Sequence, residues 1–99
     1  MNKKVLKVEI EDVNKVQSEH VILQTYRDTI AYLFDMNRNN PSFLDSPIFL
    51  EYQKKCQEST FAFEDAKTEV FNKYFPKSGI ENPINWSLDY STGELTINY

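Results

Sequence analysis

Cysteine, glycine and long apolar runs are the scarcest features of this 99-residue sequence. Its single cysteine, Cys56, cannot form an internal disulfide, so we expect a reducing, cytoplasmic location. Two glycines are too few for phosphate-cradling loops, and the sequence has no nucleophile elbow, zinc-ligand spacing or dinucleotide fingerprint. No apolar run reaches the length of a membrane span, and the run after Lys3 and Lys4 is too short and polar for a secretory leader.

Positive charge is also scarce. Eleven Lys and Arg stand against 15 Asp and Glu, which gives a net charge of −4 with both signs mixed along the chain. Because phosphate binding needs clustered positive charge, we expect no nucleic-acid partner. The chain is instead 40% hydrophobic and 14% aromatic, which is too rich for a disordered segment. These proportions predict one domain over residues 1–99 with a modest core.

The longest periodic stretch covers residues 46–75 and predicts an amphipathic helix. Ser46 is a good N-cap, and Pro47 stands at the first helical position, where its missing N–H has no cost. Pro76 disfavours helical backbone at residue 75 and so ends the run. One stripe of the helix carries apolar residues at steps of three and four, interrupted by Ser59: Phe49, Tyr52, Cys56, Phe63, Ala66, Val70 and Tyr74.

A second helix is predicted over residues 12–36, with Asp12 as its N-cap. It has two apolar lines, one of Val16, Leu23, Ile30 and Phe34 and the other of Ile22, Tyr26 and Leu33. Together they are wider than the stripe of a helix with one neighbour, so we expect contact with the other helix and with a sheet. Turn residues at 37–41 then make the two helices an antiparallel hairpin.

Three stretches have the two-residue alternation of strands, at residues 5–10, 85–90 and 94–99. In the first, Leu6, Val8 and Ile10 share one face. The last two form a β-hairpin around Gly93, a position that needs a positive φ. We expect the apolar face of this hairpin to cover the Ile22 line of the first helix.

The N-terminal strand is the candidate third strand of the sheet, and without it the last strand would be an edge open to an extended peptide. The predicted fold class is therefore α+β, a long antiparallel helical hairpin packed against a small antiparallel sheet.

The sequence predicts no catalytic residue, metal site or cofactor, and hence a non-enzymatic protein. His20 flanks the apolar face of its helix, where a structural role is the simpler interpretation, and Cys56 is assigned to core packing. Carboxylates on one face of the second helix suggest acid–base or cation chemistry as an alternative to a solvated face interleaved with lysines. They are Glu51, Glu58, Glu64, Asp65 and Glu69.

Three large apolar residues are predicted to point outward from the helices: Phe61, Val21 and Tyr32. Together with Glu58 and Asp65, which lie near Phe61 on a helical wheel, they form the predicted partner-binding face. The partner we expect is a protein or peptide, with a homodimer as a further candidate.

A helix end with Tyr74 is followed by a closing strand pair with Trp86, Asp89, Thr92 and Glu94. The order of these features resembles a small bacterial family, the CXXX repeat peptide modification system proteins. The resemblance implies an accessory that binds a precursor peptide or its radical SAM maturase. The W-x-apolar-D-x-x-T-G-E pattern also resembles the tails of short phage and mobile-element proteins. The alternative is therefore a phage-encoded or mobile-element-encoded inhibitor or structural protein that acts through the acidic helical face.

Overall fold

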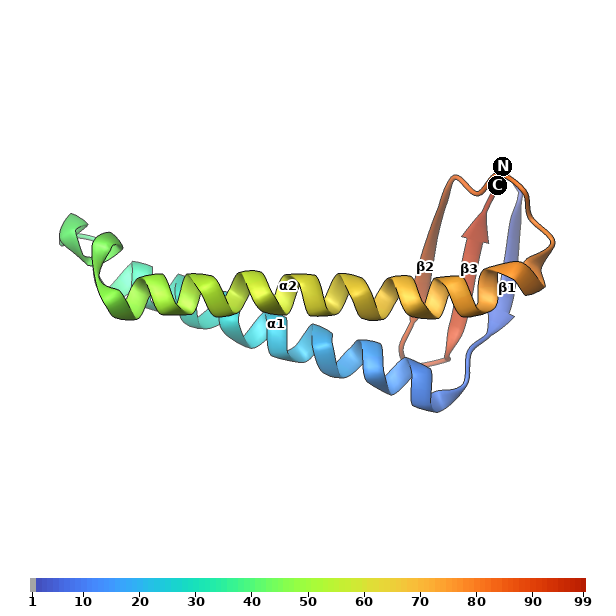
Figure 1. The fold of residues 1–99 in the computed structure, drawn as a ribbon, viewed down its shortest axis with the longest axis horizontal. Helices are drawn as coiled ribbons and strands as arrows, with labels where there is room; N and C mark the ends of the chain where they lie inside the picture. Colours follow the sequence, from blue (N-terminus) through green and yellow to red (C-terminus); the bar gives the residue numbers. More distant parts are fainter. Residues whose placement is uncertain (1) are drawn as a thin grey trace. The chain divides into compact units, whose positions relative to one another are not determined.

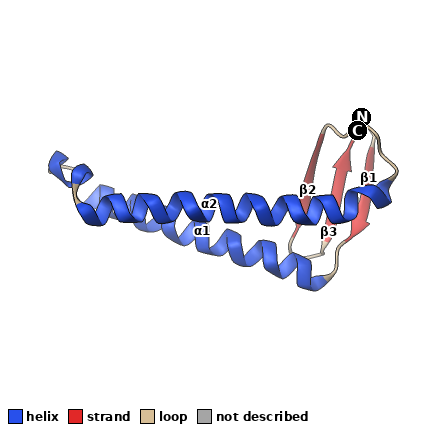
Figure 2. Cartoon of the chain, in the orientation of Figure 1, coloured by secondary structure: helices blue, strands red, loops and turns tan. Residues whose placement is uncertain are grey.

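The computed structural model describes residues 2–99 and confirms the α+β class. Two long helices and a three-stranded antiparallel sheet make up the chain, coloured by type in Figure 2. In order they are β1 (Lys3–Lys7), α1 (Ile10–Met36), a 3₁₀ turn (Pro41–Asp45), α2 (Pro47–Tyr74), a second 3₁₀ turn (Phe75–Ser78), β2 (Asn85–Asp89) and β3 (Glu94–Asn98).

These elements form two compact units. The sheet unit contains the chain up to Ser18 together with Asp65–Tyr99, and the hairpin unit contains Glu19–Glu64. The sheet unit therefore includes the start of α1 and the end of α2, while the hairpin unit includes the rest of both helices.

The last strand, β3, is the centre of the sheet. It pairs antiparallel with β1 on one side and β2 on the other, in the order β1-β3-β2 (Figure 1). Leu95 and Ile97 of β3 are fully buried. The structure thus confirms the candidate third strand, and the last strand is not an open edge. The edges of the sheet are β1 and β2.

The N-terminal strand ends earlier than predicted, at Lys7 instead of residue 10. Val8 is buried and its N–H still reaches the Gly93 carbonyl oxygen at 2.8 Å. Glu9 then turns the chain, because its carbonyl oxygen accepts the N–H groups of Asp12 and Val13. Ile10 is consequently the first residue of α1 and is 69% exposed, so it does not share the buried face of Val8.

The predicted limits of the second helix are nearly right. The Phe49 N–H lies 3.4 Å from the Ser46 hydroxyl, and the Leu50 N–H donates to the Ser46 carbonyl oxygen at 3.1 Å. Ser46 thus caps α2 as expected, with Pro47 as the first residue. At the other end the chain tightens into the 3₁₀ turn that contains Pro76, one residue earlier than predicted.

The sheet packs against the parts of the helices that belong to its own unit. Trp86 of β2 stacks on Phe71 of α2 with a centroid distance of 5.1 Å, and a side chain at Gly93 would touch Val13 of α1. The apolar side chains buried in this unit are Val8, Val13, Val16, Ala66, Val70, Tyr74, Leu95 and Ile97.

The hairpin of strands was expected to cover the Ile22 line, but Ile22 is 45% exposed, so burial of this residue is not confirmed. Within residues 2–99, neither α1 nor α2 has an apolar stretch long enough to cross a bilayer.

Candidate interaction surface

The hairpin unit has a small core and many exposed apolar side chains. Leu23 and Phe49 are its buried apolar residues, and Ser59 is its buried polar residue. Further contacts come from ring pairs, with His20 stacked on Phe63 at a centroid distance of 5.0 Å. The exposed large apolar residues of the unit are Val21, Ile22, Tyr32, Phe34, Met36, Leu44, Ile48, Leu50 and Phe61.

Part of this exposed set forms a regular row on α1, which we call the α1 seam: Ile22, Thr25, Thr29, Tyr32 and Met36. The steps between these residues alternate between three and four. That alternation is the 3.5-residue spacing by which one helix packs along another. None of the five side chains is charged. Tyr32 and Met36 are 64% and 65% exposed. The spacing therefore predicts a second helical neighbour for α1 along the seam, in addition to α2.

The two threonines of the seam do not require a polar partner. The Thr25 hydroxyl donates to the Val21 carbonyl oxygen at 2.8 Å, and the Thr29 hydroxyl donates to the Thr25 carbonyl oxygen at the same distance. Since both hydroxyl hydrogens are already used within the helix, a partner that covers them leaves no donor unsatisfied. The seam can therefore be covered as an apolar surface.

A hollow of about 400 Å³ opens beside the seam, and mostly apolar surface lines it. Its walls come from both helices of the hairpin unit and contain no charged residue: Val21, Ile22, Thr25, Tyr26, Thr29 and Tyr52. Tyr26 and Tyr52 meet across it with a centroid distance of 6.4 Å. Because no Asp, Glu, His, Cys, Lys or Arg lines the hollow and most of its surface is apolar, it is suited to hold an apolar side chain.

The five residues predicted to bind a partner are all exposed, but they do not form one surface. Val21 lines the hollow and Tyr32 belongs to the seam. Phe61 is 62% exposed and is nine residues from Tyr52, which places the two on opposite sides of α2 at about 100° per residue. Glu58 lies one turn from Phe61, and Asp65 belongs to the sheet unit.

Sequence reasoning did not assign Ile22, Thr25, Thr29 and Tyr52 to an interaction surface. It assigned Ile22 to a line covered by the sheet and Tyr52 to the core stripe. The signal that was available is the alternation of steps of three and four through uncharged residues on α1.

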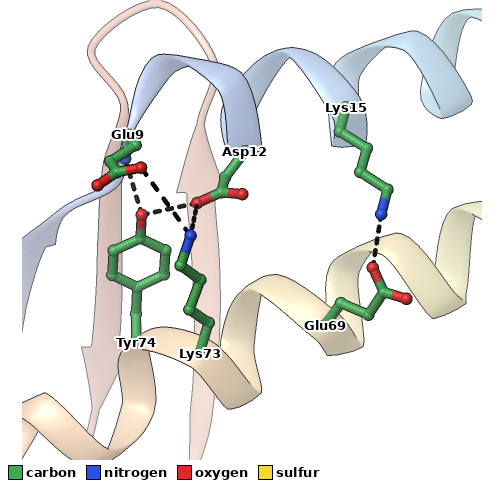
Figure 3. A network of polar contacts seen from close by, with 6 residues as sticks. All are labelled: Glu9, Asp12, Lys15, Glu69, Lys73 and Tyr74. Carbon is green, nitrogen blue, oxygen red and sulfur yellow. Dashed lines mark hydrogen bonds and ion pairs between the residues drawn. The ribbon is translucent and has the colours of Figure 1, made fainter.

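The sheet unit contains the best-connected polar cluster (Figure 3). The Tyr74 hydroxyl accepts the Glu9 backbone N–H at 3.0 Å and donates to Asp12 Oδ2 at 2.8 Å. Lys73 Nζ donates to the same Asp12 oxygen at 2.8 Å, and it lies 3.9 Å from a Glu9 carboxylate oxygen. The cluster joins the first turn of α1 to the last turn of α2.

The electrostatics of this cluster indicate a structural role. Hydrogen bonds from Lys73 and Tyr74 lower the pKa of Asp12, and burial raises the pKa of Tyr74. The bond to Asp12 raises the pKa of Lys73. At neutral pH each group therefore keeps its ordinary protonation state, and the shifts stabilise that state. We assign the cluster to holding the two helix ends together.

The other side chains that could take part in chemistry are in contact with neighbouring side chains or are half-buried. His20 is stacked on Phe63, and Cys56 is half-buried where full burial was expected. On the acidic face, Glu51 pairs with Lys55 at 3.5 Å and Glu69 with Lys15 at 2.7 Å (the second pair is drawn in Figure 3). In the part of the chain that the structure describes, no three His, Cys, Asp or Glu side chains gather in a way that could hold a metal ion.

Comparisons with protein-family models, with curated proteins and with solved structures find no match to this chain. We therefore argue function from the residues and their geometry.

Proposed function

We propose that the chain is a non-enzymatic protein-interaction module, located in the cytoplasm, whose binding surface is the α1 seam with the adjoining hollow. The observation that carries this proposal is an uncharged row at coiled-coil spacing, of which four of the five residues are exposed and Thr29 is half-buried. A patch of this kind is a common mark of a protein-binding surface. The partner's contribution is a helix, because steps of three and four match the side-chain rows of another helix.

The hollow gives this surface a place for an anchor residue. A Leu, Ile or Phe side chain of the partner, packed in the hollow against Tyr26 and Tyr52, would exchange water for aromatic contact. Fully burying such a side chain is worth about 1.5–3 kcal/mol. One or two anchors of this size, surrounded by the seam, are typical of helix-in-groove binding.

The sequence resemblance suggests which partners to test. A precursor peptide or its maturase is our proposal, supported by the closing strand pair that contains Trp86, Asp89 and Glu94. The ion pairs of Glu51 and Glu69 with lysines favour the seam over the acidic face, because they neutralise part of that face. An inhibitor that acts through acidic residues would depend on Glu58 and Asp65 instead.

Site-specific photo-crosslinking in the native host tests the proposal. The photoreactive residue benzoylphenylalanine is placed at Tyr32 on the seam or, as the matched control, at Phe61. Both positions are aromatic and more than 60% exposed, so neither substitution disturbs the core. We expect an adduct with a different protein at Tyr32 and not at Phe61. An adduct with another protein at Phe61 alone would overturn the seam as the binding surface.

A further inference from the structure

We propose that the outer edge of β1 takes up an extended, acidic peptide segment as a fourth strand of the sheet. This surface belongs to the sheet unit, so it goes beyond the proposed function, which concerns the α1 seam of the hairpin unit. Two independent features of β1 support the inference. One is a row of backbone groups with which no strand pairs within residues 2–99, and the other is a lysine at each end of the strand. The first selects an extended segment, and the second selects its charge.

The hydrogen bonds to β3 show which backbone groups of β1 are open. Asn2 and Tyr99 exchange both of their backbone hydrogen bonds, each at 2.8 Å. Because the direction of these groups alternates along an antiparallel strand, the N–H and C=O groups of Lys3, Val5 and Lys7 point away from β3. In the strand order β1-β3-β2, no strand of residues 2–99 lies on that side of β1 (Figure 1). An extended segment is the structure that can pair with all of these groups in register.

The side chains of the same three residues share one face of the sheet. Leu6 is opposite the fully buried Leu95 and therefore faces the core. Side chains alternate along a strand, so those of Lys3, Val5 and Lys7 lie on the other face. Val5 is 47% exposed, and both lysines are exposed. A new strand beside β1 would place its own side chains directly opposite these three.

The lysines make this edge positive in an acidic protein. β1 contains three lysines and no acidic residue, whereas the whole chain has a net charge of −4. In the pairing with β3, Lys3 is opposite the uncharged Asn98 and Lys7 is opposite Glu94. The Lys7 ammonium group also donates to the Thr92 carbonyl oxygen, which leaves its other donors for a carboxylate. An acidic segment therefore gains a charge pair at each end of β1, and the stronger one at Lys3.

The spacing along β1 specifies the segment further. In antiparallel pairing, the residues opposite Lys3 and Lys7 are four positions apart, and the residue midway between them is opposite Val5. We therefore expect Asp or Glu at the first and fifth positions of the segment and a β-branched apolar residue at the third.

Other occupants fit this edge less well. A second copy that pairs β1 with β1 would place Lys3 against Lys7, and like charges directly opposite each other are unfavourable. Lysines on an edge strand also discourage pairing with an apolar strand. The other edge, β2, contains no lysine and ends in Asp89, so it lacks the charge that selects an acidic segment.

Fluorescence anisotropy with the full chain tests strand addition. The probe is a peptide of sequence Thr-Glu-Thr-Val-Thr-Glu-Thr with a dye at its N-terminus. Two isomers carry one N-methyl group, either on the Val amide, which would point toward β1, or on the amide of the following Thr, which would point away. We expect the Val isomer to bind about tenfold more weakly than the unmodified peptide, because a main-chain hydrogen bond is lost. The Thr isomer, which has the same charge and mass, should bind like the unmodified peptide.

A pair of lysine variants tests the role of charge. Lys3→Glu reverses an exposed charge on the edge, and Lys54→Glu makes the same change at an exposed position of α2 in the hairpin unit. We expect Lys3→Glu to weaken binding of the unmodified peptide by about fivefold and Lys54→Glu to change it by less than about twofold. Circular dichroism checks that both variants are folded. The methylated peptides are compared on the natural chain, so that comparison is independent of the variants.

Tighter binding of the Thr isomer than of the Val isomer, together with the loss in Lys3→Glu, supports an acidic strand at β1. Equal binding of the two isomers overturns the inference, since charge alone would then hold the peptide. Equal effects of the two lysine variants also overturn it, as does the absence of binding at about 1 mM protein. The α1 seam is tested by crosslinking at Tyr32, so the two proposals can fail separately.

Discussion

Tyr74 and Asp12 are 62 positions apart in the sequence, and the Tyr74 hydroxyl donates a 2.8 Å hydrogen bond to the Asp12 carboxylate. This bond joins the last turn of α2 to the first turn of α1 (Figure 3). Tyr74 is also 4% exposed, and its hydroxyl accepts a hydrogen bond from the Glu9 N–H. One side chain therefore fills the core and provides a hydrogen-bond partner for a backbone N–H just before α1.

Removal of this hydroxyl should destabilise the protein with little change in shape. In Tyr74→Phe the Glu9 N–H and the Asp12 carboxylate each lose a partner, at a cost of about 1–3 kcal/mol. Tyr32→Phe is the control, because Tyr32 is 64% exposed. Urea unfolding followed by Trp86 fluorescence measures both free energies. Equal stability of the two variants would mean that the bond contributes nothing.

The same cluster predicts how stability depends on acidity. Its bonds lower the folded pKa of Asp12 below the ordinary value of about 3.9, so its contribution is present above that pH and is lost as the pH falls through the folded pKa. Asp12→Asn should therefore be less stable than the natural chain at pH 7 and should lose less stability between pH 5 and pH 2. The measurement is urea unfolding at each pH. Parallel losses in the two proteins would contradict the prediction.

Lys73 predicts how the stability of the protein changes at alkaline pH. Its folded pKa is raised, so its contribution to the Asp12 ion pair is present below the ordinary Lys pKa of 10.5 and is lost as the pH rises above it. Lys73→Met, which keeps the length of the side chain, should lose less stability than the natural chain above pH 10. Heat denaturation between pH 8 and pH 11 checks the slope.

The two glycines provide a matched pair for backbone strain. Gly79 and Gly93 have nearly equal φ values of +72° and +70°. A Cβ at Gly79 would meet open space, whereas one at Gly93 would lie 3.3 Å from the Val8 carbonyl oxygen. Gly79→Ala should cost about 1–2 kcal/mol from the left-handed backbone alone, and Gly93→Ala should cost more. Equal losses in chemical denaturation would show that the contact with Val8 relaxes freely.

The two units should open at different denaturant concentrations. Among residues 2–18 and 65–99 eight apolar side chains are buried, whereas Leu23 and Phe49 are the two in the hairpin unit. Thiol labelling of Cys56 reports on the hairpin unit, and fluorescence of Trp86 reports on the sheet unit. We expect Cys56 to become reactive at lower urea than the Trp86 transition, by local opening. Coincident transitions would instead indicate one cooperative unit.

The sequence by itself determined the features whose signals are local. Ser46, Pro47 and Pro76 place α2 to within a residue or two, because caps and prolines act on the backbone beside them. Gly93 marks the turn of the strand hairpin for the same reason. The exposure of Val21, Tyr32 and Phe61 also followed from helical periodicity alone.

Only the tertiary structure decided what depends on residues distant in the sequence. Asp12 was predicted to be the N-cap, but its carboxylate binds Lys73 and Tyr74 from the last turn of α2, and α1 begins two residues earlier, at Ile10. The third strand became an edge partner of β3 through pairing between residues 3–7 and 94–98, which no local signal encodes. Periodicity placed Ile22 on the second apolar line of α1, and only the packed structure shows that it remains 45% exposed, because burial depends on which residues distant in the sequence pack against that side.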